Sequence, residues 1–212
     1  MKRIIVNSDF VRRDLVAQYP MLRDKIVLIR NIVEPQPFNK IEIPKKLVFG
    51  FMGSGWSRKG LKFVLHALAL IPNATLFVAG KDSRAYKFKS MAAKLGISHR
   101  VHWAGIVSDP YNFYRNISAL IHPALYDPAP NAVMECMAVG CPVVVSENTG
   151  ATDFKDCSGV IVSDISPKVL ATHMLVAASI TSEEREELVA LTCQFDGAYL
   201  MNKIVELYES IG

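Results

Sequence analysis

The sequence lacks the features that mark several classes of protein. No apolar run approaches the roughly 20 residues that a helix needs to cross a bilayer, and the start, MKRIIVNSDF, has no long apolar segment of a signal peptide. No block of like charges stands out, and the net charge of +4 is mild, so we expect no nucleic-acid partner. We expect a cytoplasmic protein, and the basic residues leave open a peripheral contact with the inner face of the membrane.

Cysteine and histidine are also sparse. The four cysteines, Cys136, Cys141, Cys157 and Cys193, show neither CxxC pairs nor metal-ligand spacing. Free thiols in a reducing compartment are therefore expected. The histidines are scattered, so we expect no metal site. For His122, which ends an apolar run just before Pro123, we expect a structural or loop-ordering role.

Short β-branched runs alternate with helical patterns, as they do in a parallel sheet with crossover helices. A first unit is predicted as a strand at 4–7, a helix at 10–18 and a strand at 26–29, and the proline-containing segment 33–46 is predicted to be a linker. Further strands are predicted at 47–51, 75–79, 101–103, 119–122, 143–145 and 160–162, with helices at 59–70, 84–95, 110–116 and 131–139. A helical tail should follow from about Pro167, with a capping box of Thr181 and Glu184.

This order predicts an α/β fold, a Rossmann-like parallel sheet with helices on both faces. Residues 1–38 read as the closing strand–helix–strand of a preceding N-terminal domain plus linker. Residues 39–212 read as one Rossmann-like domain with a helical C-terminal tail. Ligands of such sheets bind beyond the carboxyl ends of the strands, so the strand-to-helix turns are the places to inspect.

The first such turn, FMGSGWSRKGLKF, fails two known phosphate motifs. Gly53 and Gly55 begin a dinucleotide fingerprint, but Arg58 stands at its third glycine, and a Walker A loop would need lysine where Leu61 stands. What remains is a small-residue turn with Arg58 and Lys59 at the predicted helix start. Cations are unfavourable at that end of a helix dipole unless an anion shares the place with them. Solvated surface charges are the alternative.

The second turn, LYDPAPNAVMECMAVGCPVVV, carries two acids. Asp127 and Ala129 each precede a proline, which favours extended backbone and a stiff loop. Asn131 is predicted to be the N-cap of a helix that ends before Gly140. Glu135 then lies about one turn inside this helix.

The arrangement of the second turn suits a ligand with two parts. A diphosphate can bind the free N–H groups of Asn131, Ala132 and Val133. Glu135 can accept hydrogen bonds from a ribose diol, and Asp127 can hold hydroxyls of a group beyond the phosphates. The alternative is a loop cap and a helix-start charge with purely structural roles.

These motifs together resemble a known family. The pattern RKG after a glycine loop, followed by HPALYDPAPNAVMECMAVGCPVVVSENTGATD, resembles the nucleotide-sugar half of retaining family-4 glycosyltransferases of the GT-B architecture. The runs GSGWSRKGLKFVLHAL and FVAGKD are most similar to the lipopolysaccharide-core glucosyltransferases, and the resemblance covers residues 1 to 165.

The resemblance implies roles for particular residues. Arg58 and Lys59 would neutralise the donor diphosphate, and Asp127 would face the donor sugar, so these three form the expected catalytic set. The expected donor-binding residues are Gly53, Ser54, Ile106, Asn131, Ala132, Val133 and Glu135. Ile106 would meet the base through its main chain. Neither metal nor cofactor is expected, and the donor is expected to be UDP-linked.

Two positions depart from the family pattern. Asp127 is one methylene shorter than the usual glutamate, and Pro130 replaces a common glycine and removes one N–H from the phosphate cradle.

The resemblance implies transfer of a hexose, with retention, from a nucleoside-diphosphate sugar to a saccharide or lipid-linked acceptor in surface polysaccharide or lipopolysaccharide synthesis. This chain alone should be inactive without the N-terminal domain, with Asp127 facing solvent. A nucleotide-sugar-binding module without turnover and a nucleotide-sugar epimerase of the same fold are the alternatives.

Overall fold

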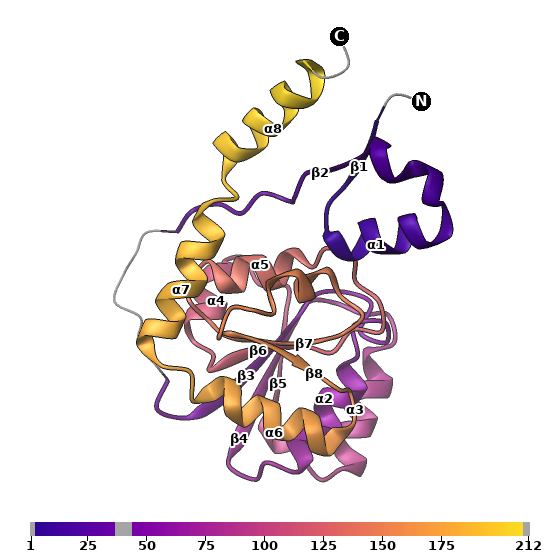
Figure 1. Cartoon of the computed structure of the whole chain (residues 1–212). Coiled ribbons are helices and arrows are strands. Elements are labelled where there is room, and N and C mark those ends of the chain that lie inside the picture. The colour runs from indigo at the N-terminus through magenta and orange to yellow at the C-terminus, as the bar shows by residue number, and fades with distance from the viewer. Residues whose placement is uncertain (1–2, 37–43, 210–212) are drawn as a thin grey trace.

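The protein is built around a six-stranded parallel sheet (Figure 1). The computed structural model describes residues 3–36 and 44–209. The strands follow the order β5-β4-β3-β6-β7-β8, and each pairs in parallel with its neighbours. Their bounds are β3 (Leu47–Met52), β4 (Ala74–Ala79), β5 (Val101–Gly105), β6 (Ala119–His122), β7 (Val143–Ser146) and β8 (Val160–Ser163).

Helices cover both faces of this sheet. One face packs against α2 (Leu61–Ala69), α3 (Ala85–Lys94) and α6 (Pro167–Ala178), and the other against α4 (Pro110–Arg115), α5 (Asn131–Met137) and α7 (Ser182–Cys193). The short turns η2 (Ser98–Arg100) and η3 (Gly150–Phe154) complete the body, and α8 (Gly197–Glu209) extends away from it (Figure 1).

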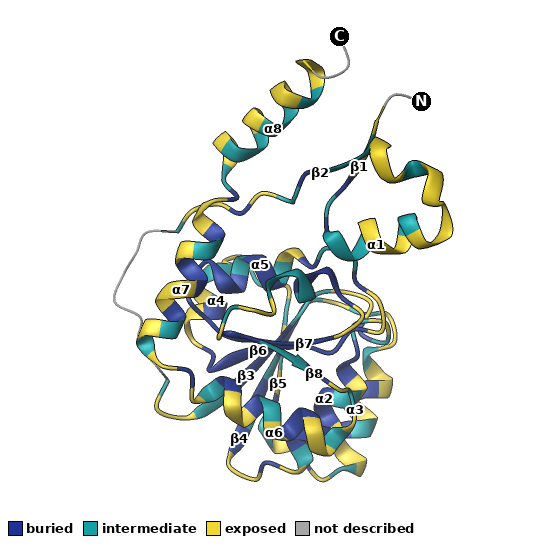
Figure 2. Cartoon of the chain, viewed as in Figure 1, coloured by how far each residue is buried: buried dark blue, intermediate teal, exposed yellow. Residues whose placement is uncertain are grey.

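The sheet is buried because its strands are apolar on both faces. Along β7, Val144 joins the core beneath α2 and α6, whereas Val143 and Val145 join the core beneath α5 and α7. Successive side chains of a strand point to opposite faces of the sheet, so each strand contributes to two separate hydrophobic cores. Figure 2 shows the central strands largely in the buried colour and the outer helix faces exposed.

A small unit precedes the sheet. It consists of β1 (Ile4–Val6), α1 (Asp9–Gln18), η1 (Pro20–Lys25) and β2 (Ile26–Leu28), and β1 and β2 form a separate parallel pair.

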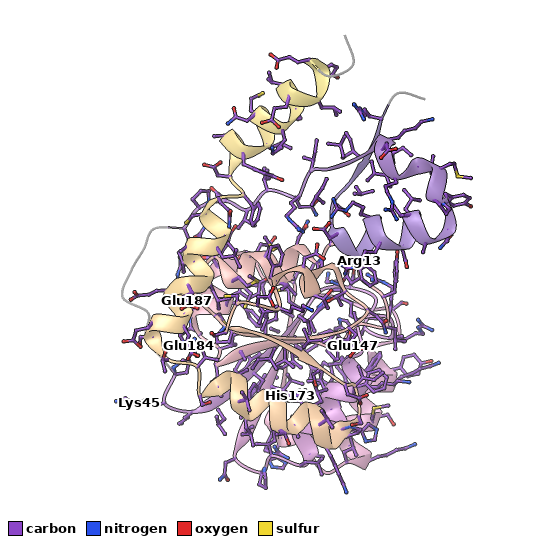
Figure 3. All side chains as sticks on the ribbon, in the orientation of Figure 1. Arg13, Lys45, Glu147, His173, Glu184 and Glu187 are labelled. Carbon is purple, nitrogen blue, oxygen red and sulfur yellow. The ribbon has the colours of Figure 1, made fainter. Side chains whose placement is uncertain are left out.

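Asp153, in η3, ties this small unit to the body. Its Oδ2 accepts a hydrogen bond from the Arg30 guanidinium at 2.6 Å and another from the backbone N–H of Asp9 at 2.6 Å. Arg13 lies on the side of α1 that faces the body (Figure 3), 3.6 Å from Oδ1 of the same carboxylate. The Asp153 side chain is only 1% exposed, so the attachment is a buried one.

The fold class predicted from the sequence is confirmed, and all the predicted strands are present. The helix predicted at 59–70 is shorter at both ends: α2 begins at Leu61, because Gly60 has a φ of 83° and ends the preceding turn in a left-handed conformation. The tail is helical, as predicted, and consists of three helices, α6, α7 and α8. The predicted capping box joins Thr181 to Glu184, which Figure 3 labels at the start of α7.

The predicted linker is irregular at residues 33–36 and 44–46, and its residues 37–43 lie outside the described part of the chain. The division into an N-terminal remnant and a second domain stays a prediction.

The sheet reverses its direction of growth between β3 and β6. After β3 the chain adds β4 and β5 on one side, then returns to place β6, β7 and β8 on the other. β3 and β6 share two registered residue pairs, Phe49 with Ala119 and Gly50 with Leu120, whereas β3 and β4 share six. Such a switch point opens a crevice beyond the strand ends, and ligands bind there in open α/β sheets.

Candidate functional site

The two turns singled out in the sequence follow the two strands at this switch point. The glycine loop (residues 53–60) follows β3, and the acid loop (residues 123–130) follows β6. They touch: the Leu125 N–H donates to the Arg58 carbonyl at 2.8 Å, and the Arg58 guanidinium donates to the Tyr126 carbonyl. Gly60 approaches the acid loop so closely that a Cβ there would lie 2.0 Å from the Pro123 carbonyl oxygen.

Hydrogen bonds fix the glycine loop to the end of β4 and the turn that follows it. The Gly53 N–H donates to the Ala79 carbonyl at 3.0 Å, and the indole N–H of Trp56 donates back to the Gly53 carbonyl at 2.8 Å. The backbone N–H of Trp56 donates to the Asp82 carboxylate at 2.7 Å. Ser54 is exposed at the top of this fixed loop.

The functional groups of the two loops converge on one carboxylate. Oδ2 of Asp127 lies 3.6 Å from Nζ of Lys59, 3.7 Å from the Arg58 guanidinium and 2.9 Å from Nε2 of His122. Asp127 is 7% exposed, so the expectation that it faces solvent is wrong. Its backbone explains this: the Asp127 N–H donates to the Asn148 carbonyl, which draws the acid loop onto the turn after β7.

Burial and charge set the protonation of this cluster. Burial lowers the pKa of His122 despite its hydrogen bond with Asp127. Burial alone would raise the pKa of Asp127, but the hydrogen bond from His122 and the charges of Lys59 and Arg58 together lower it below its usual value. At neutral pH Asp127 is therefore an anion and His122 is neutral, with its proton on Nε2.

Glu135, the second acid, is held by a tyrosine that the sequence reading missed. The hydroxyl of Tyr114, in α4, donates to Oε2 of Glu135 at 3.0 Å. Burial first, and the nearby Glu135 carboxylate second, raise the pKa of Tyr114, so the hydroxyl stays a donor. Tyr114 is fully buried, and it therefore fixes one oxygen of the half-buried Glu135.

The start of α5 differs from the prediction. Pro130, not Asn131, occupies the N-cap position, because its backbone is extended, with φ −74° and ψ 96°. Asn131 is the first helical residue, and its Oδ1 accepts a hydrogen bond from the side chain of Asn31 at 2.6 Å. The N–H of Val133 donates to the Pro130 carbonyl at 3.0 Å, so it is not the free donor that was predicted.

Ile106 follows β5, the edge strand of the sheet, and is 69% exposed. Gly105, just before it, lines a hollow of about 410 Å³. The other residues that line this hollow are Trp56, Gly80, Lys81, Asp82, Ser83, Ala85, Lys89 and Trp103. The structure thus brings Arg58, Lys59 and Asp127 together and places Ile106 beside a separate hollow.

Neither a metal-binding cluster nor a membrane-spanning helix is found in the described chain. Within residues 3–36 and 44–209, no group of three or more His, Cys, Asp or Glu side chains could hold a metal ion. None of the described helices has the length and apolar character required to cross a membrane. All four cysteines are free thiols, as predicted.

Removing the Tyr114 hydroxyl should destabilise the protein. Tyr114→Phe leaves the ring in the core and takes away only the hydrogen bond to Glu135, and hydrogen bonds to charged groups contribute about 1.5–3 kcal/mol. Urea unfolding should show that loss in the free energy of unfolding. Tyr86→Phe, at an exposed ring on α3, should change nothing. Equal midpoints for wild type and Tyr114→Phe would contradict this stabilising role.

The order of the sheet defines a Rossmann-like domain, and solved glycosyltransferases of the GT-B architecture share its fold. The structure of Anabaena Alr3699/HepE in complex with UDP matches with a TM-score of 0.85 at 19% identity, over 99% of this chain and 64% of that one. At that identity the match speaks for the fold alone.

Sequence comparisons identify the family. The family model for glycosyl transferases group 1 matches residues 33–188, and the chain therefore belongs to that family. Lipopolysaccharide glucosyltransferase WaaG of Escherichia coli is 31% identical over 127 residues, 56% of this chain and 34% of its own length. The uncharacterized glycosyltransferase MJ1607 of Methanocaldococcus jannaschii is 23% identical over 191 residues, 80% of this chain and 49% of its own length. The matches thus span half or less of these curated relatives.

Proposed function

We propose that the site between the glycine loop and the acid loop binds the diphosphate of a nucleotide sugar. The observation that carries the proposal is the meeting of two cations, Arg58 and Lys59, at the switch point of a parallel sheet. The relatives support it: the Anabaena protein of the same fold is described in complex with UDP and with UDP-glucose. We infer a UDP-linked hexose as the donor.

Within this proposal each part of the donor has its own contacts. Arg58 and Lys59 take the diphosphate, helped by the backbone of Ser54. Gly53 allows the ligand a close approach but contributes no N–H, because its N–H already donates to the Ala79 carbonyl. The N–H groups of Asn131 and Ala132 add to this cradle, and Val133 contributes less because Pro130 already accepts from its N–H. Glu135 takes the ribose, and Asp127 takes the sugar. The base lies in the hollow beside Gly105 and meets the main chain of Ile106.

The same groups would assist transfer. As the bond between the sugar and the diphosphate breaks, negative charge grows on the leaving phosphate, and cations already in place stabilise it without reorganisation. We propose retention at the sugar carbon, with neither metal nor cofactor, and a saccharide or lipid-linked acceptor in surface polysaccharide or lipopolysaccharide synthesis.

A ribose test examines the proposal directly. Wild type and Glu135→Ala are titrated by calorimetry with UDP and with its 2′,3′-dideoxy analogue. Because Glu135 is assigned to the diol, the variant should bind UDP about tenfold more weakly and the analogue as well as wild type does. GDP and ADP in the same titrations identify the base. Wild-type protein that binds none of these diphosphates would refute the proposed function.

We also propose that this chain binds donor without transferring it, because the acceptor side of the cleft belongs to an N-terminal domain. A cleft closed over both substrates aligns them and excludes water. Transfer by the 212-residue chain is compared with transfer by a protein that also contains an N-terminal domain. Equal rates would refute the need for that domain, and donor binding without transfer by the longer protein would favour the binding-module alternative.

A further inference from the structure

The carboxylate of Asp127 faces both Arg58 and Lys59, the two cations assigned to the diphosphate. Both cations lie within ion-pair distance of its Oδ2, at 3.7 and 3.6 Å. Resting on the proposed function above, we propose that Asp127 is a built-in counter-ion, which neutralises the two cations in the free protein and with which a bound diphosphate must compete for them. His122 is the positioning residue that holds it there.

His122 is suited to this role by its place in the sheet. It ends β6, is fully buried, and its Nε2–H donates to Oδ2 of Asp127 at 2.9 Å. Its Nδ1 has no hydrogen-bond partner within the described residues, so the bond to Asp127 is the one polar contact that orients the ring there. The Asp127 backbone is also fixed, because its carbonyl accepts from the Gly150 N–H at 2.9 Å. Both the side chain and the backbone of Asp127 are therefore held in place.

The distances leave Arg58 and Lys59 able to turn from Asp127 to a ligand. Separations of 3.6 and 3.7 Å lie beyond hydrogen-bond length, so Lys59 and Arg58 are neutralised by Asp127 without donating to it. Phosphate oxygens can approach to about 2.7–2.9 Å and accept charge-assisted hydrogen bonds from the same groups. The Arg58 side chain is 49% exposed and can turn towards such a ligand. An anion must therefore outweigh a resident negative charge, which favours a diphosphate over a singly charged anion.

Removing that charge should tighten binding of the probe, inorganic pyrophosphate. By calorimetry at low salt, Asp127→Asn should bind pyrophosphate about fivefold to tenfold more tightly than wild type, because two ion pairs no longer compete. Asp156→Asn, which removes the same charge at an exposed position after η3, should leave the affinity unchanged. In a Lys59→Ala background the gain from Asp127→Asn should shrink, since only Arg58 remains to be released.

The role of His122 has its own readout. His122→Gln keeps an N–H donor and should bind pyrophosphate as wild type does. His122→Leu no longer holds the Asp127 carboxylate beside the two cations and should bind pyrophosphate severalfold more tightly. With Asp127→Asn already present, His122→Leu should have no further effect on affinity. Thermal unfolding of each variant shows whether a change in affinity comes from loss of the fold or from a changed position of the Asp127 carboxylate. Weaker binding by His122→Leu in both backgrounds would assign His122 a structural role and overturn its part of the proposal.

The outcomes separate this inference from the function on which it rests. If wild type binds pyrophosphate and Lys59→Ala weakens that binding, the phosphate site stands. Asp127→Asn with unchanged or lower affinity would then overturn the counter-ion alone. If wild type binds no pyrophosphate and Asp127→Asn binds none, both the phosphate site and the counter-ion are refuted.

Discussion

Gly60→Ala should unfold the protein at a much lower temperature and abolish diphosphate binding. Gly60 has a φ of 83°, where an L side chain costs about 1–2 kcal/mol. Its Cβ would also lie 2.0 Å from the Pro123 carbonyl oxygen, a backbone atom that no rotamer change can move. Together these effects should cost about 3–5 kcal/mol and lower the melting temperature by about 10 °C. Binding fails because the acid loop is pushed away from the glycine loop.

Gly55→Ala is the matched control in the same loop. Gly55 also has a positive φ, 69°, but no atom lies within 4 Å of the position that its Cβ would take. This variant should therefore show only the backbone cost, about 1–2 kcal/mol. Differential scanning calorimetry gives both melting temperatures. Equal destabilisation by the two substitutions would mean that the close approach of the loops contributes nothing.

Lys59→Ala should weaken diphosphate binding about 10- to 100-fold. Lys59 is only 14% exposed, and the far end of its side chain folds over Gly53, which places the ammonium group at the mouth of the glycine loop. Removing the donor of a charge-assisted hydrogen bond at such a site costs about 1.5–3 kcal/mol. Titration calorimetry with UDP measures the change.

Lys62→Ala provides the comparison for charge. Lys62 lies on the exposed side of α2, with its ammonium over the ring of Phe63, and its substitution removes the same charge from the protein. The Lys62→Ala variant should retain wild-type affinity, and chelator should not affect any of these titrations. Wild-type affinity in Lys59→Ala would exclude the glycine loop as the phosphate site.

The strands could be predicted well from the sequence because most are short runs of β-branched or other apolar residues between turn residues. Asp109 before Pro110 begins α4 with a side-chain cap, as such pairs commonly do. The limits of α2 and α5 were harder to predict. Gly60 and Pro130 each fit two local conformations, and interactions with other parts of the chain decide between them.

The same distinction applies to the candidate site. Arg58, Lys59 and Asp127 were found because their positions after two strands make them neighbours in any parallel sheet of this order. The partners of the acids were not found. Tyr114 reaches Glu135 only because α4 and α5 pack side by side. His122 contacts Asp127 only because the acid loop turns back after Pro123. No residue pattern in the sequence predicts that turn.

The short pairing between β3 and β6 means that a ligand at the site could hold the two halves of the sheet together. This seam, with two registered pairs, joins one half of the sheet to the other, and the glycine loop and acid loop stand on opposite sides of it. A ligand that contacts both loops would connect the two half-sheets across this seam. The binding energy would then oppose separation of the two half-sheets. The free energy of unfolding of the domain would therefore rise as the ligand site is filled.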